Sequence, residues 1–442
     1  NGAVVIAGGM GSGSVSGDVN GSSIGGLVGS NNSDGTITVA RASGAVTGPG
    51  EKIGGLVGNN DGTISQAYAT GGVGGGANVG GLVGRNGGSI ADAYATGAIG
   101  LASNSDEMLG HKNLGGVIGW SEVGSSANRL YFSGNVSGNG FPSGTVGAVV
   151  GHAESGAVVG YAYFNGDTAG TSFDRGGASG RSTAQMQQQA QFGGFNFGEN
   201  AVWRIYDGYT TPMLKAFLTP LQVSASGAAS KVYDGVVASA GTLSYVGLLN
   251  GDVGASGTAS YGNALNVGNY ALGGLWSTKY DITYAGTTTL AITPRALSVI
   301  LGGSKVYDGQ LGFANATLTL DNTVSGANLG VTGTAQFVDK NAGAAKPVNL
   351  TGLALSGNEL GNYSLAETAT GTAEISRASL SLASVSAASK VYDGGTAASL
   401  SATFEGVFGA DQVQLSGASA NFADKNAGAS KDVNYSVAGS NL

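Results

Sequence analysis

The chain has 442 residues, with 83 glycines, 6 prolines and a formal net charge of −8, and only 10% of its residues are charged. Glycine without a three-residue period excludes collagen, and the lack of clustered Lys and Arg argues against a nucleic-acid partner. Cysteine is absent, which excludes disulfides, thiolate metal sites and a thiol nucleophile. A hydrophobic share of 41% predicts a chain that is folded throughout.

We expect neither a secretion leader nor a membrane span in this sequence. No apolar run reaches the ~18 residues that span a bilayer, and Asn1 opens into a strand-like stretch rather than a secretion leader. We therefore expect that the chain does not span a membrane and that it is a processed or excerpted piece of a longer protein. Because extracellular eukaryotic arrays are usually stapled by disulfides, the absence of cysteine favours a bacterial surface protein.

Glycine-rich repeats occupy the first part of the chain. Their pentapeptide is GGLVG at 25–29, 54–58 and 80–84, GGVIG at 115–119 and GAVVG at 147–151. Its second position recurs after 29, 26, 35 and 32 residues, which is the spacing of a solenoid. Three strands of about five residues fill one period, so residues 1–175 are predicted to form a parallel β-helix. Glycine is expected at the corners, where φ is positive or two backbones approach closely.

Two columns of like residues recur at fixed phase and are predicted to form structural ladders along the β-helix axis. The alternative for the aromatic column is a flat stripe that binds sugar rings. A calcium site is not expected, because the repeats lack the G-G-x-G-x-D pattern. The columns are Tyr68, Tyr94, Tyr131 and Tyr163, with Arg41 at the same phase, and Asn31, Asn60 and Asn86.

The pattern GGLVGxNxGxIxxAYATG, at 54–71 and again at 80–97, resembles the GLUG repeat of large bacterial adhesins in the filamentous-haemagglutinin class. The resemblance covers about residues 15–168 and departs from the pattern at Ala148, which replaces a glycine. It implies a right-handed parallel β-helix outside the cell, secreted by the two-partner route.

The pattern changes in residues 176–219, which are predicted to cap the open end of the β-helix. Ser182 followed by Gln185 fits a capping box, so we expect one short helix over 182–192. An aromatic cluster that binds a ligand is the alternative. The same segment resembles the region on the C-terminal side of GLUG arrays in these adhesins. The residues assigned to the cap are Trp203, Tyr206, Tyr209 and Pro212.

A second array comes next, in which SKVYDG occurs three times. Short Val, Leu, Thr and Tyr runs between glycine turns predict small β-sandwich-like or β-grasp-like modules at 220–296, 297–378 and 379–442. Because its Lys, Tyr and Asp recur in every module, the motif is predicted to be structural rather than an acid–base site. These residues are Lys231, Tyr233, Asp234, Lys305, Tyr307, Asp308, Lys390, Tyr392 and Asp393.

The modules resemble the YDG and MBG families of bacterial surface proteins. The first module departs from the pattern because it lacks the DKNAG found at 339–343 and 424–428. The third module is incomplete by comparison, since the strand around 373–375 has no counterpart before Leu442. Either the polypeptide continues, or a neighbouring molecule supplies the strand.

These features predict an extracellular bacterial adhesin or surface fibre that acts in attachment and biofilm formation through a rigid multivalent shaft. The alternatives are a self-associating matrix filament assembled by strand exchange, and a β-helical polysaccharide-processing enzyme. Expected partners are a host or environmental surface, a glycan or other cells, other copies of the chain, and an outer-membrane two-partner transporter. No catalytic, cofactor-binding or metal-binding residue is predicted. The candidate binding loop is the 101–113 insertion, with Leu101, Asp106, Glu107, His111 and Lys112.

Overall fold

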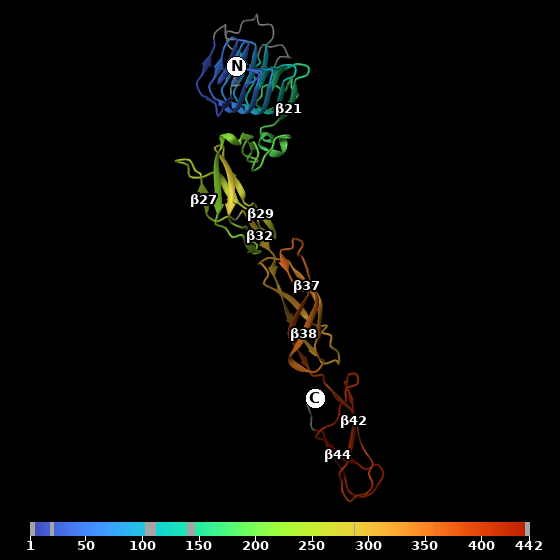
Figure 1. The fold of residues 1–442 in the computed structure, drawn as a ribbon. Coiled ribbons are helices and arrows are strands. Elements are labelled where there is room, and N and C mark those ends of the chain that lie inside the picture. Colours follow the sequence, from blue (N-terminus) through green and yellow to red (C-terminus); the bar gives the residue numbers. More distant parts are fainter. Residues whose placement is uncertain (1–4, 18–21, 102–111, 139–145, 287, 438–442) are drawn as a thin grey trace. The chain divides into compact units, whose positions relative to one another are not determined.

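The computed structural model describes residues 5–17, 22–101, 112–138, 146–286 and 288–437 (Figure 1). The protein is all-β, with a parallel β-helix followed by small β modules. The chain divides into two compact units: 1–227 with 240–260 and 272–288, and 228–239 with 261–271 and 289–442. Within the described part, no helix is long and apolar enough to cross a membrane.

Three full coils of the β-helix contain four strands each, rather than the three expected from the sequence. The second full coil consists of β8 (Lys52–Gly54), β9 (Val57–Asn60), β10 (Thr63–Ala69) and β11 (Val73–Gly75). The extra corner lies inside the pentapeptide: the amides of Leu56 and Val57 both donate to the carbonyl of Leu82 in the next coil, at 2.9 and 3.0 Å. Two successive amides that share one acceptor turn the chain, so β8 and β9 join different sheets.

The strands of successive coils stack in four parallel sheets. The long-strand sheet contains β1 (Val5–Ala7), β2 (Met10–Gly11), β6 (Thr36–Ala42), β10, β14 (Ser89–Ala95), β18 (Ser126–Phe132), β21 (Val158–Asn165) and β22 (Ser179–Arg181). The other three contain β3 (Val15–Ser16), β7 (Val46–Thr47), β11 and β15 (Ile99–Leu101); β4 (Ser23–Gly25), β8, β12 (Asn78–Gly80), β16 (Asn113–Gly115) and β19 (Val146–Gly147); and β5 (Val28–Asn31), β9, β13 (Val83–Asn86), β17 (Ile118–Ser121) and β20 (Val150–Ala153).

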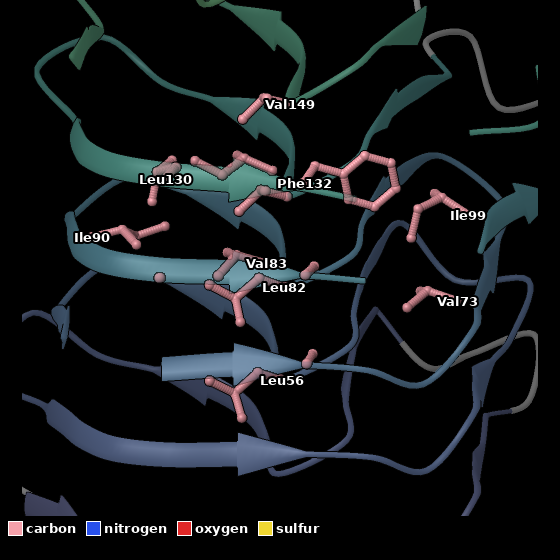
Figure 2. Packing of buried hydrophobic residues seen from close by; sticks show 14 of the residues in the cluster. Leu56, Val73, Leu82, Val83, Ile90, Ile99, Leu130, Phe132 and Val149 are labelled. Carbon is pink, nitrogen blue, oxygen red and sulfur yellow. The ribbon is translucent and has the colours of Figure 1, made fainter. Parts of the chain in front are cut away.

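The core of the β-helix is a stack of small and branched apolar side chains. Leu56 and Leu82 lie in one column, and Val73 and Ile99 lie in another (Figure 2). All four are buried. Because the sequence repeats, residues of the same type occupy the same position in successive coils. Each coil therefore fills the interior with about the same side-chain volume.

The pentapeptide glycines are required by close backbone approach and not by a left-handed φ. A Cβ on Gly55 would lie 2.1 Å from the Gly81 carbonyl oxygen, and one on Gly81 would lie 2.1 Å from the Gly116 oxygen. Ala148 takes this place in the last coil, where the chain continues into residues 166–181 instead of another pentapeptide. Its amide donates to the carbonyl of Phe173 at 2.7 Å. The alanine therefore stands where no further pentapeptide carbonyl is stacked on it.

One residue in the middle of each long strand adopts the left-handed conformation. Gln66, with φ 49°, separates Ser65 from Ala67, and the ladder pairs the residues on either side of it. The side chains of a strand alternate between the inward and outward faces of the sheet, and this extra residue shifts the alternation by one position. As a result, Ala67 points inward and Tyr68 points outward. The column comprises Val39, Gln66, Asp92, Arg129 and Tyr161, with φ between 49° and 54°.

The cap segment, residues 176–219, lies only in part where it was expected: its first strand, β22, pairs with β21 at the end of the long-strand sheet. Its aromatic residues pack on the outward face of the long-strand sheet and not over the open end. The expected helix is replaced by two 3₁₀ turns, η1 (Gln185–Gln187) and η2 (Gln189–Gln191), because Gln188 between them is extended. Ser182 and Gln185 bond reciprocally, as in a capping box. The segment also contains β23 (Trp203–Arg204), β24 (Met213–Leu214) and η3 (Lys215–Phe217).

At the end of the β-helix, Asp174 satisfies two backbone amides of the last pentapeptide. Its Oδ1 accepts the amides of Val149 and Val150, each at 2.7 Å. In the preceding coil, the carbonyl of Val149 accepts the corresponding two amides. The Asp174 carboxylate therefore replaces the carbonyl of a following coil, and both amides, which are buried, keep an acceptor.

The modules are built from short strands. In the first module, β25 (Thr219–Ala225) lies between β27 (Leu243–Val246) and β31 (Tyr280–Gly286), β28 (Ser256–Ser260) pairs with β30 (Gly273–Trp276), and β32 (Thr289–Thr293) lies between β26 (Ser230–Val232) and β29 (Gly268–Ala271). In the second module, β33 (Arg295–Ala296) pairs with β39 (Tyr363–Ser364), β34 (Ser298–Gly302) pairs with β36 (Thr317–Asp321), and the largest sheet has the order β35 (Ser304–Val306), β40 (Thr368–Ser376), β38 (Gly343–Ser356), β37 (Gly330–Phe337). In the third module, β41 (Ser381–Ala387) pairs with β42 (Leu400–Glu405), and β43 (Ser419–Phe422) pairs with β44 (Val433–Ser436).

Candidate functional site

Three tyrosines of the long-strand sheet stack in one column. Tyr68 and Tyr94 have ring centroids 4.8 Å apart with planes 5° from parallel, and Tyr94 and Tyr131 are 4.7 Å apart at 6°. Tyr163 is the register partner of Tyr131 in the next strand, and Arg41 precedes Tyr68. A stripe that binds sugar rings would need free ring faces. Here neighbouring rings cover each other's faces, so the stacked faces are not available to a sugar.

The cap segment covers this column along several coils. Phe217 meets Tyr68 edge-on at 4.8 Å, Trp203 lies 6.0 Å from Tyr131, and Phe192 lies 5.2 Å from Tyr163. The Tyr131 hydroxyl donates to the carbonyl of Pro212 at 2.7 Å, and burial raises the pKa of this phenol above its ordinary value. The aromatic clusters of the β-helix and the cap segment thus form one core.

A buried carboxylate anchors the cap segment to the β-helix. Asp92 accepts the indole N–H of Trp203 at 2.8 Å and both Nε and Nη2 of Arg129, at 2.6 and 2.7 Å. Its hydrogen bonds raise the pKa of Arg129 above the ordinary value. Sequence reasoning missed this site, because Asp92 stands where other coils have Gln66 and Val39 and so shows no periodicity.

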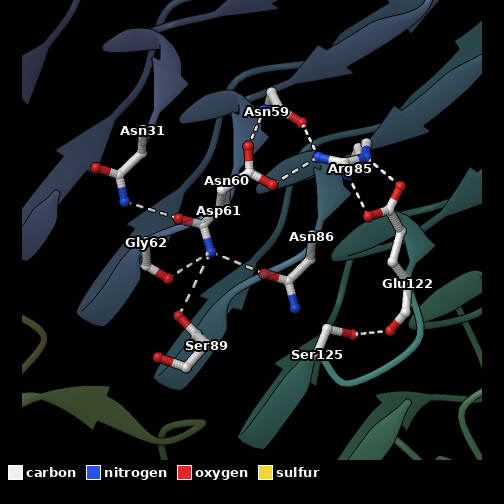
Figure 3. A network of polar contacts seen from close by, with 10 residues as sticks. All are labelled: Asn31, Asn59, Asn60, Asp61, Gly62, Arg85, Asn86, Ser89, Glu122 and Ser125. Atoms are coloured by element: carbon white, nitrogen blue, oxygen red, sulfur yellow. Dashed lines mark hydrogen bonds and ion pairs between the residues drawn. The ribbon is translucent and has the colours of Figure 1, made fainter. Parts of the chain in front are cut away.

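The asparagines form a hydrogen-bonded ladder inside the coil corners (Figure 3). Nδ2 of Asn31 donates to Oδ1 of Asn60, and Nδ2 of Asn60 donates to Oδ1 of Asn86, each at 2.7 Å. All three side chains are buried. A second pair, Asn113 to Asn78 at 2.7 Å, was not predicted, because it occurs in two coils only.

A charged cluster lies beside the asparagine ladder (Figure 3). Nη1 of Arg85 bonds to Oδ1 of Asn59 at 2.6 Å and to Oδ1 of Asp61 at 2.7 Å, and its other nitrogens form a two-point ion pair with Glu122. The cluster spans three coils. It binds the coils to one another with side chains that satisfy each other's charge.

The candidate binding loop falls largely outside the described residues, which exclude Asp106, Glu107 and His111. Leu101 ends β15, and Lys112 precedes β16. Over the ranges that are described, no group of three or more His, Cys, Asp and Glu residues is arranged to hold a metal ion.

A cleft of about 800 Å³ runs beside the exposed end of the tyrosine column, within the first unit. One wall is formed by Arg41, Tyr68 and Thr70, and the other includes Tyr209 and Lys279. Tyr209 is 52% exposed, and its ring stacks on Trp276 at 5.4 Å and 11°. The cleft presents hydroxyl groups and two cations beside apolar side chains such as Phe217 and Leu249, so it suits a ligand with both polar and apolar faces.

In the second array, the Lys and Asp of each motif close a turn. Nζ of Lys305 lies 2.7 Å from Asp308 and donates to the carbonyls of Gln310 and Gly312 at 2.6 and 2.7 Å. Asp308 accepts the amide of Gln310 at 2.9 Å, and Gly309 has φ +74°. The lysine hydrogen bond lowers the pKa of Asp308. The same ion pair joins Lys231 to Asp234 at 2.7 Å and Lys390 to Asp393 at 2.9 Å.

The motif tyrosines reach into the segment that comes after them. Tyr233 of the first module meets Tyr363 of the second edge-on at 5.3 Å. The Tyr307 hydroxyl of the second module donates a hydrogen bond to the Asp411 carboxylate of the third. The same carboxylate lies 3.1 Å from Nζ of Lys340. Tyr392 of the third module is 61% exposed. The motif thus combines a turn with a contact to the next module, and only the turn can be inferred from its residues.

The cap segment contains a similar sequence, I-Y-D-G at 205–208, and its tyrosine also contacts the module that follows. The Tyr206 hydroxyl donates to the carbonyl of Tyr280 at 2.7 Å and accepts the amide of Ile282 at 2.8 Å. Burial raises the pKa of Tyr206 to about 12. Arg204 and Lys215 both pair with Asp281 in the same strand. The first strands of the module are therefore fixed to the cap segment by one tyrosine and one ion-pair cluster.

Comparison with protein families agrees with the two arrays. Residues 75–100 match the model of the GLUG motif, and residues 293–371 and 376–442 match the model of the YDG domain. The chain therefore carries a GLUG motif and YDG domains. Such domains are found in extracellular or surface proteins. No curated protein and no solved structure matches the chain.

Proposed function

We propose that this chain is part of an extracellular bacterial adhesin or surface fibre that acts in attachment and biofilm formation. In this proposal it is of the filamentous-haemagglutinin type and is exported by an outer-membrane two-partner transporter. The GLUG coils form a stiff shaft, and the modules with YDG motifs follow it in the chain. Its partners are a host or environmental surface, a glycan or other cells, and other copies of itself.

The observation that carries the proposal is that the recurring side chains bond to one another. Asn60 bonds to both neighbouring coils, Tyr94 stacks between two other tyrosines, and Tyr307 joins two modules. A chain whose repeated chemistry is directed at its own neighbours resists bending and extension. Stiffness lets many weak contacts act together at a distance from the cell.

The test is attachment of beads that carry the full chain to host cells, glycan arrays and abiotic surfaces under flow. Beads with albumin set the background. We expect retention well above background on at least one surface, and loss of retention with Thr70→Trp if the cleft makes the contact. Thr63→Trp is the matched control, since Thr63 begins β10, the strand that Thr70 directly follows, is exposed and lies outside the cleft. Background retention on every surface, or release of reducing ends from a polysaccharide, would contradict the proposal.

A self-associating matrix filament is the second candidate. The observation that favours it is that repeated side chains already join like units in register, as Asn60 does between neighbouring coils. Sedimentation of the purified full chain without any ligand separates the two functions. Concentration-dependent growth into filaments supports the matrix role, and a constant sedimentation coefficient opposes it.

A further inference from the structure

The cleft beside the tyrosine column combines apolar side chains with hydroxyl groups. Its apolar lining includes Phe217, Leu218 and Leu249. Hydroxyl groups come from threonines of the β-helix and of the segments packed beside it, namely Thr70, Thr96, Thr219 and Thr278. A sugar ring has the same two characters, because its C–H faces are apolar and its rim carries hydroxyl groups. The volume of about 800 Å³ lies in the range of natural ligand sites and is large enough for a few sugar rings.

Arg41 places a cation in this cleft without a carboxylate of its own. Its Nη1 donates to the Tyr68 hydroxyl at 3.3 Å, and its Nε lies 3.1 Å from Sδ of Met10. The guanidinium also lies 5.9 Å from the centroid of the Phe217 ring. Over the described residues, no Asp or Glu pairs with Arg41, and none lines the cleft. The guanidinium is therefore held in place while its charge is unmatched, in a chain whose net charge is −8.

The hydroxyl of Tyr94 is a second group without a partner. Its neighbours in the column are both bonded, since the Tyr68 hydroxyl accepts from Arg41 and the Tyr131 hydroxyl donates to Pro212. In the part of the chain that the structure describes, no residue bonds to the Tyr94 hydroxyl, and Tyr94 lines the cleft. Burial raises the pKa of Tyr94 well above its ordinary value. The phenol therefore keeps its proton at neutral pH and can donate a hydrogen bond to a ligand.

The opposite wall supplies an aromatic surface and a cation that is already paired. The Tyr209 ring stacks on Trp276 at 5.4 Å, and Tyr209 is still 52% exposed. Nζ of Lys279 lies 3.1 Å from Oδ1 of Asp252. The unmatched charge of the cleft is thus that of Arg41, and an anionic group of a ligand is expected beside it.

We propose that this cleft binds an oligosaccharide that carries a carboxylate. The carboxylate pairs with the guanidinium of Arg41, and the Tyr94 hydroxyl donates to an oxygen of the sugar. The C–H faces of the sugar rings lie against the apolar side chains of the cleft and the exposed ring of Tyr209. This site rests on the attachment function proposed above, for which it names the class of glycan.

Isothermal titration calorimetry of the full chain tests the site in solution. The probes are trigalacturonic acid, a hyaluronan tetrasaccharide and disialic acid, each beside a counterpart whose carboxylates are reduced to primary alcohols. We expect saturable binding of at least one acid, and binding at least about tenfold weaker for its reduced counterpart, because a charge-assisted hydrogen bond is lost. Absence of binding by all three acids, or equal affinity for an acid and its reduced form, would overturn the proposal.

Two variants locate the binding in the cleft. Arg41→Gln should weaken binding of the acid at least about tenfold and leave the reduced counterpart nearly unchanged. Arg175→Gln is the matched control, since Arg175 is exposed and lies outside the cleft, and its loss should change the affinity by less than about twofold.

Tyr94→Phe keeps the aromatic ring and removes only the hydroxyl. It should weaken the acid and the reduced form alike, by about three- to tenfold, because a hydrogen bond to an uncharged oxygen is lost. Urea unfolding confirms that each variant is folded. Equal effects of Arg41→Gln and Arg175→Gln on binding of the acid would contradict the site.

The site and the attachment function fail in different ways. Retention of beads on an abiotic surface, together with no binding of the acidic sugars in solution, refutes the site and leaves attachment standing. Binding of an acid in solution that depends on Arg41, together with background retention on every surface, supports the site and refutes attachment.

Discussion

Gly81→Ala tests the close packing of the coils. The new Cβ would lie 2.1 Å from the Gly116 carbonyl oxygen and 2.9 Å from the Ala95 Cβ. Real contacts of this kind need at least about 3 Å, so the two coils must separate locally by about 1 Å. That movement stretches the bonds from the Gly81 and Leu82 amides, now 3.2 and 2.9 Å. With about 1 kcal/mol for each bond and 1–3 kcal/mol for overpacking, we expect a loss of about 3–5 kcal/mol.

The assay is urea unfolding of the full chain followed by tryptophan fluorescence, because Trp120 and Trp203 both lie in the first unit. Gly100→Ala is the matched control. Gly100 has a φ outside the left-handed region and nothing within 4 Å of its Cβ position, so its change should stay within about 0.5 kcal/mol. If the two variants differ by less than about 1 kcal/mol, close approach is not the reason for glycine at the pentapeptide.

Further predictions concern the ladder, the end of the β-helix and the module contact. Asn60→Leu should destabilise the first unit by about 3 kcal/mol in the same urea assay, because it leaves buried amide groups unpaired on both sides; an effect below 1 kcal/mol would mean that the ladder contributes little. Asp174→Ala should cost about 2–4 kcal/mol, whereas Asp174→Asn, which keeps a carbonyl acceptor, should cost clearly less; equal losses would refute the acceptor role. Tyr307→Phe should broaden the distance distribution between spin labels on the second and third modules, measured by pulsed electron paramagnetic resonance, while Tyr392→Phe should leave it unchanged. Finally, the hydrogen bond from Tyr307 lowers the pKa of Asp411. A carboxylate with a lowered folded-state pKa stabilises the fold above its unfolded pKa, so the module contact should weaken as pH falls below about 4, and the spin-label distribution should broaden there; a distribution independent of pH between 7 and 2 would contradict this.

The fold class could be predicted from the sequence because the repeats impose one phase on every coil. The pentapeptide period is long enough for one coil and too short for a separate domain, and the tyrosine and asparagine positions follow from the same phase. The number of strands per coil was predicted wrongly. Leu56 and Val57 form a corner inside an apolar run, and hydrophobicity alone does not distinguish a corner from a straight strand.

Features that occur once in the chain could not be predicted. Asp174 and Asp92 each act through a contact fixed only by the tertiary fold, and Trp203 reaches Asp92 across 111 positions of sequence. The cap segment was expected over the open end because exposed strand edges need a cover. Asp174 and β22 occupy that edge, and the aromatic residues pack on the tyrosine column instead. The reach of Tyr307 into the third module likewise has no local signal.

Stretching of single full-length chains between cysteines introduced near the two ends tests most directly whether the repeats form a mechanically stable array. We expect discrete cooperative unfolding events, with length gains of about 3.5 Å per residue released that correspond to whole modules and to the β-helix. We also expect Asn60→Leu to lower the force of the β-helix event alone. Smooth extension at low force, without discrete events, would contradict the claim that the recurring side chains hold the coils and modules together.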